Sequence, residues 1–566
     1  MPPSLDAPTV RTWCRLALAA LGRAREEIDA INVYPVADGD TGTNLYLTVE
    51  SAAQAVDAVC DGHAAADPEA GPSLPEAFRA MSHGALIGAR GNSGTILAQL
   101  LRGMNESLAA APAPQPDAAA LCRALRAAAD SAYEAVARPA EGTMLTVAAA
   151  AAEAARAALE PAPAAGGASR AEGAPGGDLG TVVRAAHLGA REALAATPGQ
   201  LGVLREAGVV DAGGLGLVAV LGALADAVTG EAPRRREAAG AAARAPVVKA
   251  AQEHSCPEGD AAPGGPAFEV IYLLEAPAAA VPPLRARLDA LGDSLVVVGG
   301  DGLWNVHVHV DDVGAAVEAG IEAGRPHRIR VTHFGAQTRR TPGGRGRERA
   351  VVALVRGEGM AALCEQAGAV VVALGAGEAP ASGEISAAVR RTGAREVILL
   401  PNGTELRPAA GAAAAQARAD GVRVALIPTR SAVQGIAALA VHEPSRRFDE
   451  DVVAMTSAAG ATRYAELAVA ERESWTMAGV CQAGDVLGLI DGDVAVIGAD
   501  IAGTAVRVLD RMLAAGGEMV TLVLGATAPA GLATRLEAHV RDTHLAVDTV
   551  TYEGGQASCP LLIGVE

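Results

Sequence analysis

The segment Asn32-Val-Tyr-Pro-Val-Ala-Asp38-Gly-Asp40-Thr41-Gly42-Thr43-Asn44 joins two predicted helices and is rich in carboxylate, hydroxyl and amide side chains. Its Asp-Gly-Asp triplet sets two hard oxygen ligands on one glycine-hinged turn, as Mg²⁺ with bound phosphates requires. Thr43 or Asn44 is expected to cap the following helix, whose free N–H groups favour anions. The segment therefore predicts a cation site beside a phosphate site. The alternative is an Asx-rich turn that only caps a helix.

Composition limits the classes of protein that the chain can represent. Its 566 residues are too many for one core, so several domains are expected. Half of the residues are hydrophobic but only 2% are aromatic, which predicts cores of closely packed Ala, Val and Leu. The net charge of −19, without a basic run, argues against nucleic acid and anionic membrane surfaces as partners.

The cysteines and the N-terminus predict a cytoplasmic location. Seven scattered cysteines without a CxxC motif suit reduced thiols better than a disulfide framework. The first residues have no basic region followed by an apolar stretch, and no apolar run reaches the length of a membrane span. We therefore expect a soluble protein with no integral membrane segment.

The single lysine, Lys249, excludes several nucleotide-binding mechanisms. A P-loop needs a GxxxxGK[ST] motif, and Lys249 also lacks the sequence partners of a protein-kinase lysine. The segment Gly91-Asn92-Ser93-Gly94 is one residue too short for a GxSxG nucleophile elbow. Phosphate binding must therefore rest on metal ions, backbone amides, hydroxyl groups and arginine.

The first 230 residues have the periodicity of eight helices, at about 9–29, 44–60, 73–87, 95–108, 117–137, 141–159, 179–195 and 208–228. Four polar, glycine-bearing motifs precede the second, fourth, sixth and eighth helices. In an up-and-down bundle alternate helices point the same way, so these four N-termini are expected at one end. Each would add free N–H groups and a positive dipole end to a Mg-nucleotide pocket.

Four motifs carry a resemblance to a known family. They are Asn32–Asn44, Gly88-Ala-Arg-Gly-Asn-Ser-Gly94, Glu141-Gly-Thr-Met-Leu-Thr-Val147 and Val209-Val-Asp-Ala-Gly-Gly214. Together they resemble the DhaL-type kinase domain, in the form found in the family of fatty acid kinase catalytic subunits (FakA-like). The resemblance extends over the whole chain. It implies an all-α eight-helix barrel that holds an adenine nucleotide (ATP or ADP) and two Mg²⁺ ions at one end.

The resemblance also implies roles for individual residues. Asp38 and Asp40 would be the catalytic, metal-bridging carboxylates, and Asn32 stands roughly where relatives place a third metal ligand. The residues expected at the nucleotide are Thr41, Thr43, Asn44, Arg90, Gly91, Asn92, Ser93, Gly94, Thr143, Met144, Asp211, Gly213 and Gly214. Two of these have an alternative role: Ser93 could be a nucleophile, and Arg90 could be a surface arginine.

The chain is expected to fold as a multidomain protein. A helical barrel over residues 1–230 is followed by a linker at 231–266, a small α+β middle module at 267–341, a second linker at 342–349, and an α/β region at 350–566. The Ala/Gly/Pro-rich stretch 160–177 is expected to be a mobile loop. Alternating strands and helices from Ala350 predict a parallel sheet. From about 450 to 500 short strands are expected, with Asp491-Gly492-Asp493 as a hairpin turn.

His307 and His309 alternate on a predicted strand of the middle module, so both imidazoles face one side. That spacing suits Zn²⁺, although such a pair can equally be a polar sheet face. Related sequences tend to have a cysteine on the preceding strand, where this chain has Glu269. A carboxylate can also bind zinc, so Glu269, His307 and His309 are a candidate metal site.

The function implied by the resemblance is ATP- and Mg²⁺-dependent phosphorylation of a fatty acid carboxylate to an acyl phosphate. A separate DegV-like protein would present the fatty acid, and the C-terminal region would dock that partner or support a homodimer. Two alternatives stay open. One is a dihydroxyacetone kinase-like (glycerone kinase) transfer to a small hydroxylated acceptor, and the other is a scaffold that senses nucleotide without turnover.

Overall fold

The computed structural model describes residues 3–35, 39–67, 71–109, 116–159, 178–230, 266–333, 349–375, 377 and 380–566. The chain divides into two compact units, Met1–Arg340 and Thr341–Glu566. The expected mobile loop at 160–177 lies outside the described residues, as do nearly all of both predicted linkers, Lys249 and Cys256. Asp38 also lies outside them.

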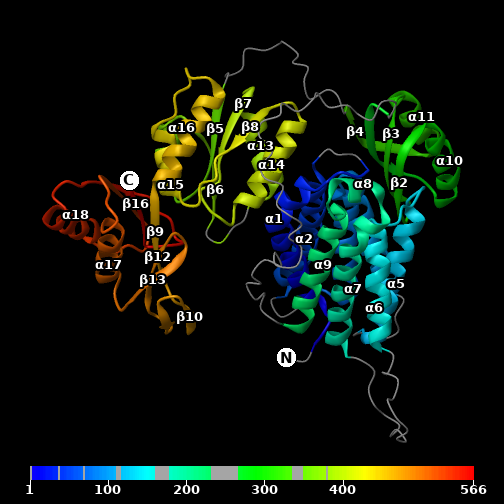
Figure 1. The fold of residues 1–566 in the computed structure, drawn as a ribbon, viewed down its shortest axis with the longest axis horizontal. Coiled ribbons are helices and arrows are strands. Elements are labelled where there is room, and N and C mark those ends of the chain that lie inside the picture. Colours follow the sequence, from blue (N-terminus) through cyan, green and yellow to red (C-terminus); the bar gives the residue numbers. More distant parts are fainter. Residues whose placement is uncertain are drawn as a thin grey trace, which may run out of the picture. The chain divides into compact units, whose positions relative to one another are not determined.

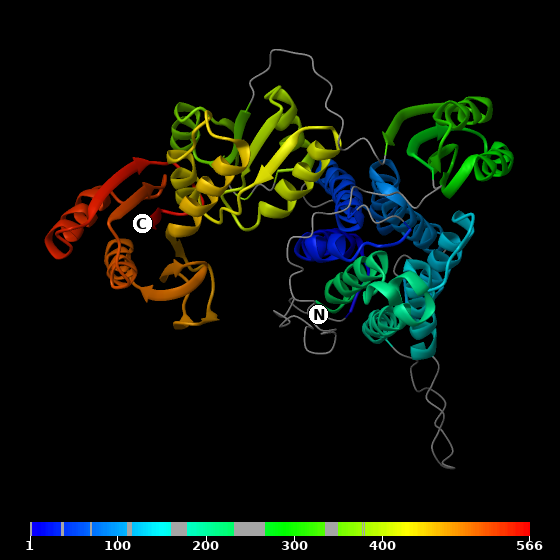
Figure 2. The same cartoon turned by 45° about the horizontal axis from the view of Figure 1, so that its top comes forward.

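Eight long helices of the first unit form a closed ring, in which each contacts the next and α9 returns to α1 (Figures 1 and 2). The ring confirms the predicted all-α barrel. A short helix, α8, lies between α7 and α9 and was not predicted. The bounds are α1 Ala7–Ala30, α2 Thr41–Ala66, α3 Leu74–Gly88, α4 Gly91–Ala109, α5 Ala118–Ala135, α6 Met144–Leu159, α7 Leu179–Gln200, α8 Gly202–Ala207 and α9 Ala212–Thr229.

Local sequence fixes most of the helix starts. Asp6, Asp117, Asp178 and Asp211 each accept a backbone N–H three residues ahead, and Ser73 with Glu76 forms a capping box. The prediction that Thr43 or Asn44 caps the second helix was wrong. α2 begins at Thr41, so Thr43 and Asn44 lie inside its first turn.

The middle module is a four-stranded antiparallel sheet of order β2-β3-β1-β4, with α10 and α11 against one face (Figure 1). The bounds are β1 Phe268–Glu275, a 3₁₀ turn at Ala278–Ala280, α10 Val281–Leu291, β2 Gly292–Gly300, β3 Leu303–Val310, α11 Val313–Ala323 and β4 Arg325–His333. The predicted α+β module is confirmed. The edge strand β4 was not predicted, because its arginines and histidines give it little apolar alternation.

The second unit begins with a parallel four-stranded sheet of order β6-β5-β7-β8, which confirms the predicted parallel pairing. Its elements are β5 Arg349–Arg356, α12 Glu358–Gln366, β6 Val370–Leu374, α13 Ser382–Arg391, β7 Glu396–Leu400, α14 Arg407–Ala419, β8 Arg423–Leu426, α15 Ala432–Ala440 and α16 Phe448–Ala461. The expected change to strands at about 450 was therefore early, since α16 continues to Ala461.

A mixed six-stranded sheet of order β13-β12-β9-β16-β14-β15 and a small hairpin, β10 with β11, complete this unit. The Asp491-Gly492 turn joins β12 to β13 as predicted, with Ile490 opposite Asp493. The bounds are β9 Arg463–Val469, β10 Ser474–Thr476, β11 Gly479–Cys481, β12 Val486–Ile490, β13 Asp493–Gly498, α17 Ile501–Leu513, β14 Met519–Leu524, α18 Leu532–Thr543, β15 Asp548–Glu553 and β16 Leu561–Val565.

Candidate functional site

The N-termini of α2 and α4 meet side by side at one end of the helical ring. The hydroxyl oxygens of Thr41 and Ser93 are 3.5 Å apart. The Asn44 amide donates to Asp40 Oδ1 at 2.8 Å, which orients that carboxylate at the start of α2. Because both helices begin here, their unpaired N–H groups and positive dipole ends favour bound anions at this end.

Two glycines of the Gly91–Gly94 motif permit this close approach. A Cβ on Gly91 would lie 2.4 Å from the Asn44 amide nitrogen, and one on Gly94 would lie 2.3 Å from Thr48 Oγ1. Gly91 also has a φ of +53°, in the left-handed region that favours glycine. The motif thus has a packing role that its position in the sequence alone did not reveal.

Asp29, at the end of α1, is a site residue that the sequence reasoning missed. Its Oδ1 accepts the backbone N–H groups of Gly42 and Thr43 at 2.6 and 3.0 Å, and its Oδ2 accepts the Thr43 hydroxyl at 2.9 Å. Asp29 of α1 therefore caps α2, in place of the residue within the motif that the sequence predicted. Burial raises the pKa of the Asp29 carboxyl. The Thr43 hydroxyl, predicted at the nucleotide, is engaged in this contact with α1.

The N-termini of α6 and α9 meet at the buried carboxylate of Asp211. Asp211 Oδ2 accepts Gly214 N–H at 2.6 Å, and the carboxylate also accepts the Met144 N–H. Burial raises the pKa of the Asp211 carboxyl to about 6, against the opposing effect of these two bonds. The charge of Asp211 in turn raises the pKa of Tyr34, after burial as the main cause. Tyr34 thereby links this helix pair to the segment that precedes α2.

The remaining predicted nucleotide residues sit at the same helix starts. Thr143 immediately precedes α6, and its hydroxyl donates to the Ala140 carbonyl at 2.7 Å. A Cβ on Gly213 would lie 3.3 Å from Met144 Cβ, which places the two motifs in contact. Arg90 donates its backbone N–H to Thr48 Oγ1 at 3.3 Å.

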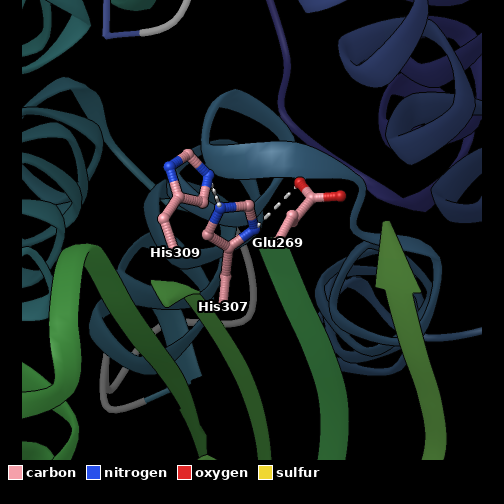
Figure 3. A group of neighbouring side chains, drawn as sticks. All are labelled: Glu269, His307 and His309. Carbon is pink, nitrogen blue, oxygen red and sulfur yellow. Dashed lines mark hydrogen bonds and ion pairs between the residues drawn. The ribbon is translucent and has the colours of Figure 1, made fainter. Parts of the chain in front are cut away.

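The middle module brings its three candidate metal ligands together, as predicted. Glu269 is paired in register with His309 across β1 and β3, and His307 lies two residues earlier on β3. The two Nε2 atoms are 3.1 Å apart, and His307 Nδ1 is 3.7 Å from Glu269 Oε1. Figure 3 shows the three side chains pointing from their strands toward a helical segment of the ring.

Burial governs the charge state of this cluster. His307 and His309 are 1% and 5% exposed. Burial lowers the pKa of His307 to about 3, so its imidazole is neutral and able to act as a metal ligand or an acceptor. Burial raises the pKa of Glu269, while the charges of His309, Arg330 and Arg90 act in the opposite direction. The effect of Arg90 indicates that the cluster lies near the α4 motif.

One polar pocket joins the two groups of residues. It is lined from the helical ring and from the middle module by Asn32, Pro35, Asp40, Thr41, Asn44, Gly91, Asn92, Ser93, Glu269, His307 and His309. Apart from Pro35, the sequence predicted the members of both groups, but it gave no sign that they share one pocket. Asp38, the other predicted carboxylate of this motif, lies outside the described residues.

The donor atoms fit two kinds of metal ion. Carboxylate, hydroxyl and amide oxygens from Asp40, Thr41 and Asn92 are the hard ligands that Mg²⁺ prefers. Asn92 Oδ1 is buried and has no hydrogen-bond partner among the residues that the structure describes. The ligand atoms of Glu269, His307 and His309 all lie within 4.8 Å of one another, a mixed N/O set that suits Zn²⁺ or another transition metal.

Comparison with known protein families agrees with this architecture. Residues 35–226 match the DAK2 domain, residues 265–341 match the middle domain of the FakA-like fatty acid kinase proteins, and residues 350–566 match the C-terminal domain of the same proteins. A DAK2 helical domain followed by these two regions defines a multidomain kinase protein. The chain belongs to the FakA-like family of fatty acid kinase subunits.

Two relatives match this chain over nearly its whole length. An uncharacterised protein of Staphylococcus haemolyticus is 29% identical over 95% of both chains, and protein YloV of Bacillus subtilis is 28% identical over 98% of this chain and 99% of its own. Among solved structures, a DegV family protein of Corynebacterium glutamicum covers 39% of this chain and 97% of its own at 15% identity and a TM-score of 0.31. The Streptococcus pneumoniae fatty acid kinase B3 protein, loaded with linoleic acid, covers 33% and 76% at 13% identity and a TM-score of 0.28.

One helix among the described residues is long and apolar enough to cross a membrane. This helix is α9, and 67% of it is buried within the protein. α9 contacts α1, α2, α6 and α7, so its apolar surface is that of a core helix in the ring.

Proposed function

We propose that the chain is the ATP- and Mg²⁺-dependent subunit that phosphorylates a fatty acid carboxylate to an acyl phosphate. One observation carries the proposal: Asp40, Asn44 and Ser93 converge where α2 and α4 begin, in a pocket lined by oxygen donors. Family membership supports a kinase subunit, and the acceptor follows the family resemblance.

In this proposal Asp38 and Asp40 hold the Mg²⁺ ions, with Asn32 as a further ligand, and Asn44 fixes the orientation of Asp40. Bound Mg²⁺ would neutralise the phosphate oxygens of ATP. The Thr41 and Ser93 hydroxyls and the backbone N–H groups of Gly91–Gly94 would bind the phosphates. Thr143, Met144, Gly213 and Gly214 would line the nucleoside side, and Asp211 would hold the α6 and α9 N-termini in place.

The chemical step needs little from the protein beyond placement and charge stabilisation. A carboxylate oxygen attacks the γ-phosphorus, the bond to the β,γ-bridging oxygen breaks, and ADP leaves. A carboxylate is already ionised at neutral pH, so no strong general base is needed. The helix N-termini stabilise the charge on the transferred phosphoryl group.

The histidine cluster faces the same pocket and completes the proposed site. We propose that Glu269, His307 and His309 bind one Zn²⁺ ion there, because their ligand atoms converge and His307 is held neutral. A bound ion at this position would supply positive charge to the acceptor carboxylate or phosphoryl oxygens. The chain's own part is to hold both imidazoles in a buried, fixed orientation.

We also propose that the protein is soluble and cytoplasmic and that a separate carrier of the DegV type presents the fatty acid. The net charge of −19 and the scattered cysteines are consistent with this setting. The second unit would dock the carrier, and a homodimer is compatible with this arrangement.

The test is ATP consumption and acyl phosphate formation by the purified chain with Mg²⁺, with and without a carrier loaded with fatty acid. We expect turnover only with the loaded carrier. Turnover with dihydroxyacetone instead would replace the acceptor in the proposal. Tight ATP binding without turnover on any acceptor would contradict the kinase function and favour a nucleotide sensor.

A further inference from the structure

The middle module is joined to the helical ring by an edge strand. Val296 of β2 forms a β-bridge with Val136, just after α5, and Ala137 N–H donates to the Leu295 carbonyl at 3.3 Å. Val296 and Val298 pack against Leu86 and Ala135 in a small buried cluster. We call this contact the docking seam. Strand β2 and Asn305 form one side of it, and the ends of α3 and α5 form the other.

Two arginines span the docking seam. Arg285 of α10 donates to the Glu134 carbonyl of the ring at 2.8 Å and to the Val297 carbonyl of its own module at 2.6 Å. Arg102 of α4 lies so close to Gly300 that a Cβ there would be 1.6 Å from its Nη2. The seam is therefore held by directional bonds and close packing as well as by apolar contact.

Asn305 is the member of the seam nearest in sequence to the histidines. Successive side chains on a strand point to opposite faces, so Asn305, His307 and His309 share the face of β3 turned to the ring. The Asn305 amide donates to the Leu86 carbonyl at 3.3 Å. Leu86 lies in the last turn of α3, directly before the loop that leads to Gly91 and Ser93.

We propose that Asn305 is a positioning residue, which ties the histidine-bearing strand to the α3–α4 turn and so places His307 and His309 over the phosphate-binding motif. This inference rests on the proposed function, whose two halves lie on different domains of one unit. The hydrogen bond from Asn305 to Leu86 joins the strand of one half to the helix end of the other, and we expect a small displacement there to reduce the rate of transfer.

The burial of Asn305 supports a role beyond packing. Its side chain is 2% exposed, and its Oδ1 has no hydrogen-bond partner among the described residues. A buried amide with one unpaired oxygen is less favourable for stability than an apolar side chain of the same shape. The bond to Leu86 is the compensating contact that the structure records.

The experiment compares three variants of the full chain with wild type. Asn305→Leu removes the donor but keeps the approximate volume. Gly300→Val disturbs the seam by displacing Arg102. Gly300 lies on β2, whereas the histidines lie on β3. Trp304→Phe is the matched control: it removes one hydrogen bond from the same strand, to the Ala276 carbonyl, on the opposite face.

Three readouts are taken on each protein: kcat with loaded carrier, the Kd for ADP with Mg²⁺, and amide hydrogen exchange of residues 134–138 and 294–298. We expect Asn305→Leu to lower kcat by about 10- to 100-fold with an ADP Kd within about twofold of wild type. Exchange in both segments should become faster. Gly300→Val should change the readouts in the same direction, and Trp304→Phe should leave them unchanged.

An unchanged kcat and unchanged exchange in Asn305→Leu would overturn the inference, as would rapid exchange of residues 134–138 in the wild-type protein. An equal fall in kcat for Trp304→Phe would show a general packing effect and would also overturn it. Absence of phosphoryl transfer by wild type would instead overturn the proposed function. In that case the exchange data still decide whether Asn305 holds the seam.

Discussion

The tripeptide Asp-Gly-Asp occurs twice in the chain, at 38–40 and at 491–493, in two different settings. Both glycines have positive φ, +66° at Gly39 and +92° at Gly492. Asp40 precedes a helix, accepts the Asn44 amide and lines a polar pocket. Asp493 is exposed and pairs with Ile490 across a hairpin. The same turn-forming residues become a candidate metal site only where helix N-termini and other oxygen donors surround them.

The largest expected difference between the two turns is in catalysis. Asp40→Ala removes a proposed Mg²⁺ ligand and should lower phosphoryl transfer by at least about 1000-fold, because each metal contact contributes several kcal/mol to the transition state. Asp493→Ala, the matched control, should keep wild-type activity. Steady-state rates with loaded carrier measure both. Equal activity of the two variants would remove the distinction between the turns.

A second prediction concerns the histidine cluster, which lines the pocket together with Asp40 of the first turn. His309→Ala should abolish zinc binding and lower transfer by about 100-fold, because it removes one of three gathered ligands. His327→Ala, on β4 of the same module and outside the cluster, should retain both properties. Metal content by mass spectrometry and the transfer rate are the measurements. Zinc retained at wild-type content in His309→Ala would contradict the proposed ligand set.

A third prediction uses the pH dependence of stability at the α6 and α9 N-termini. Because the folded-state pKa of Asp211 is raised to about 6, its contribution to stability is fully present below its unfolded pKa of about 4 and is lost as pH rises through 6. Asp211→Asn keeps an acceptor for Gly214 without the charge. The difference in unfolding free energy between wild type and variant should therefore change by up to about 1.4 kcal/mol per pH unit between pH 4 and 6.

Urea unfolding of wild type and Asp211→Asn at pH 4.5, 5.5, 6.5 and 7.5 measures this effect, and the variant should gain relative to wild type as pH rises. A difference that stays constant over the whole range would show that the carboxyl titrates outside this window.

The smallest expected effects are at the glycines. Gly492→Ala should destabilise the protein by about 1 kcal/mol through its positive φ alone, without loss of activity. Gly91→Ala should lower stability by more and also weaken nucleotide binding, because its Cβ would meet the Asn44 amide. Thermal unfolding and ADP titration separate the two. Equal stability losses with unchanged ADP affinity would contradict the packing role of Gly91.

Several features of the fold and of the site could be predicted from short stretches of sequence. The helical ring followed from apolar periodicity, and the turn at Asp491 followed from its position between two short strands. The alternation of His307 and His309 correctly gave a shared face. Each of these inferences depends on residues close together in the chain.

The features that the sequence did not reveal depend on contacts between distant residues. Asp29 caps α2 from α1 and accepts the Thr43 hydroxyl. The bond from Asn305 to Leu86 joins residues 219 positions apart. No local pattern marks such a pair, and without it nothing predicts that the histidine cluster and the α4 motif line one pocket.

We propose that one pocket combines a nucleotide half from the helical ring with a histidine half from the middle module. Calorimetric titration of ADP with Mg²⁺ into wild type, Asp40→Ala and His307→Gln, together with the transfer rate of each, tests this proposal. We expect Asp40→Ala to lose both nucleotide affinity and transfer, whereas His307→Gln should bind ADP as wild type does and lose transfer. Wild-type ADP affinity in Asp40→Ala, or wild-type transfer in His307→Gln, would contradict it.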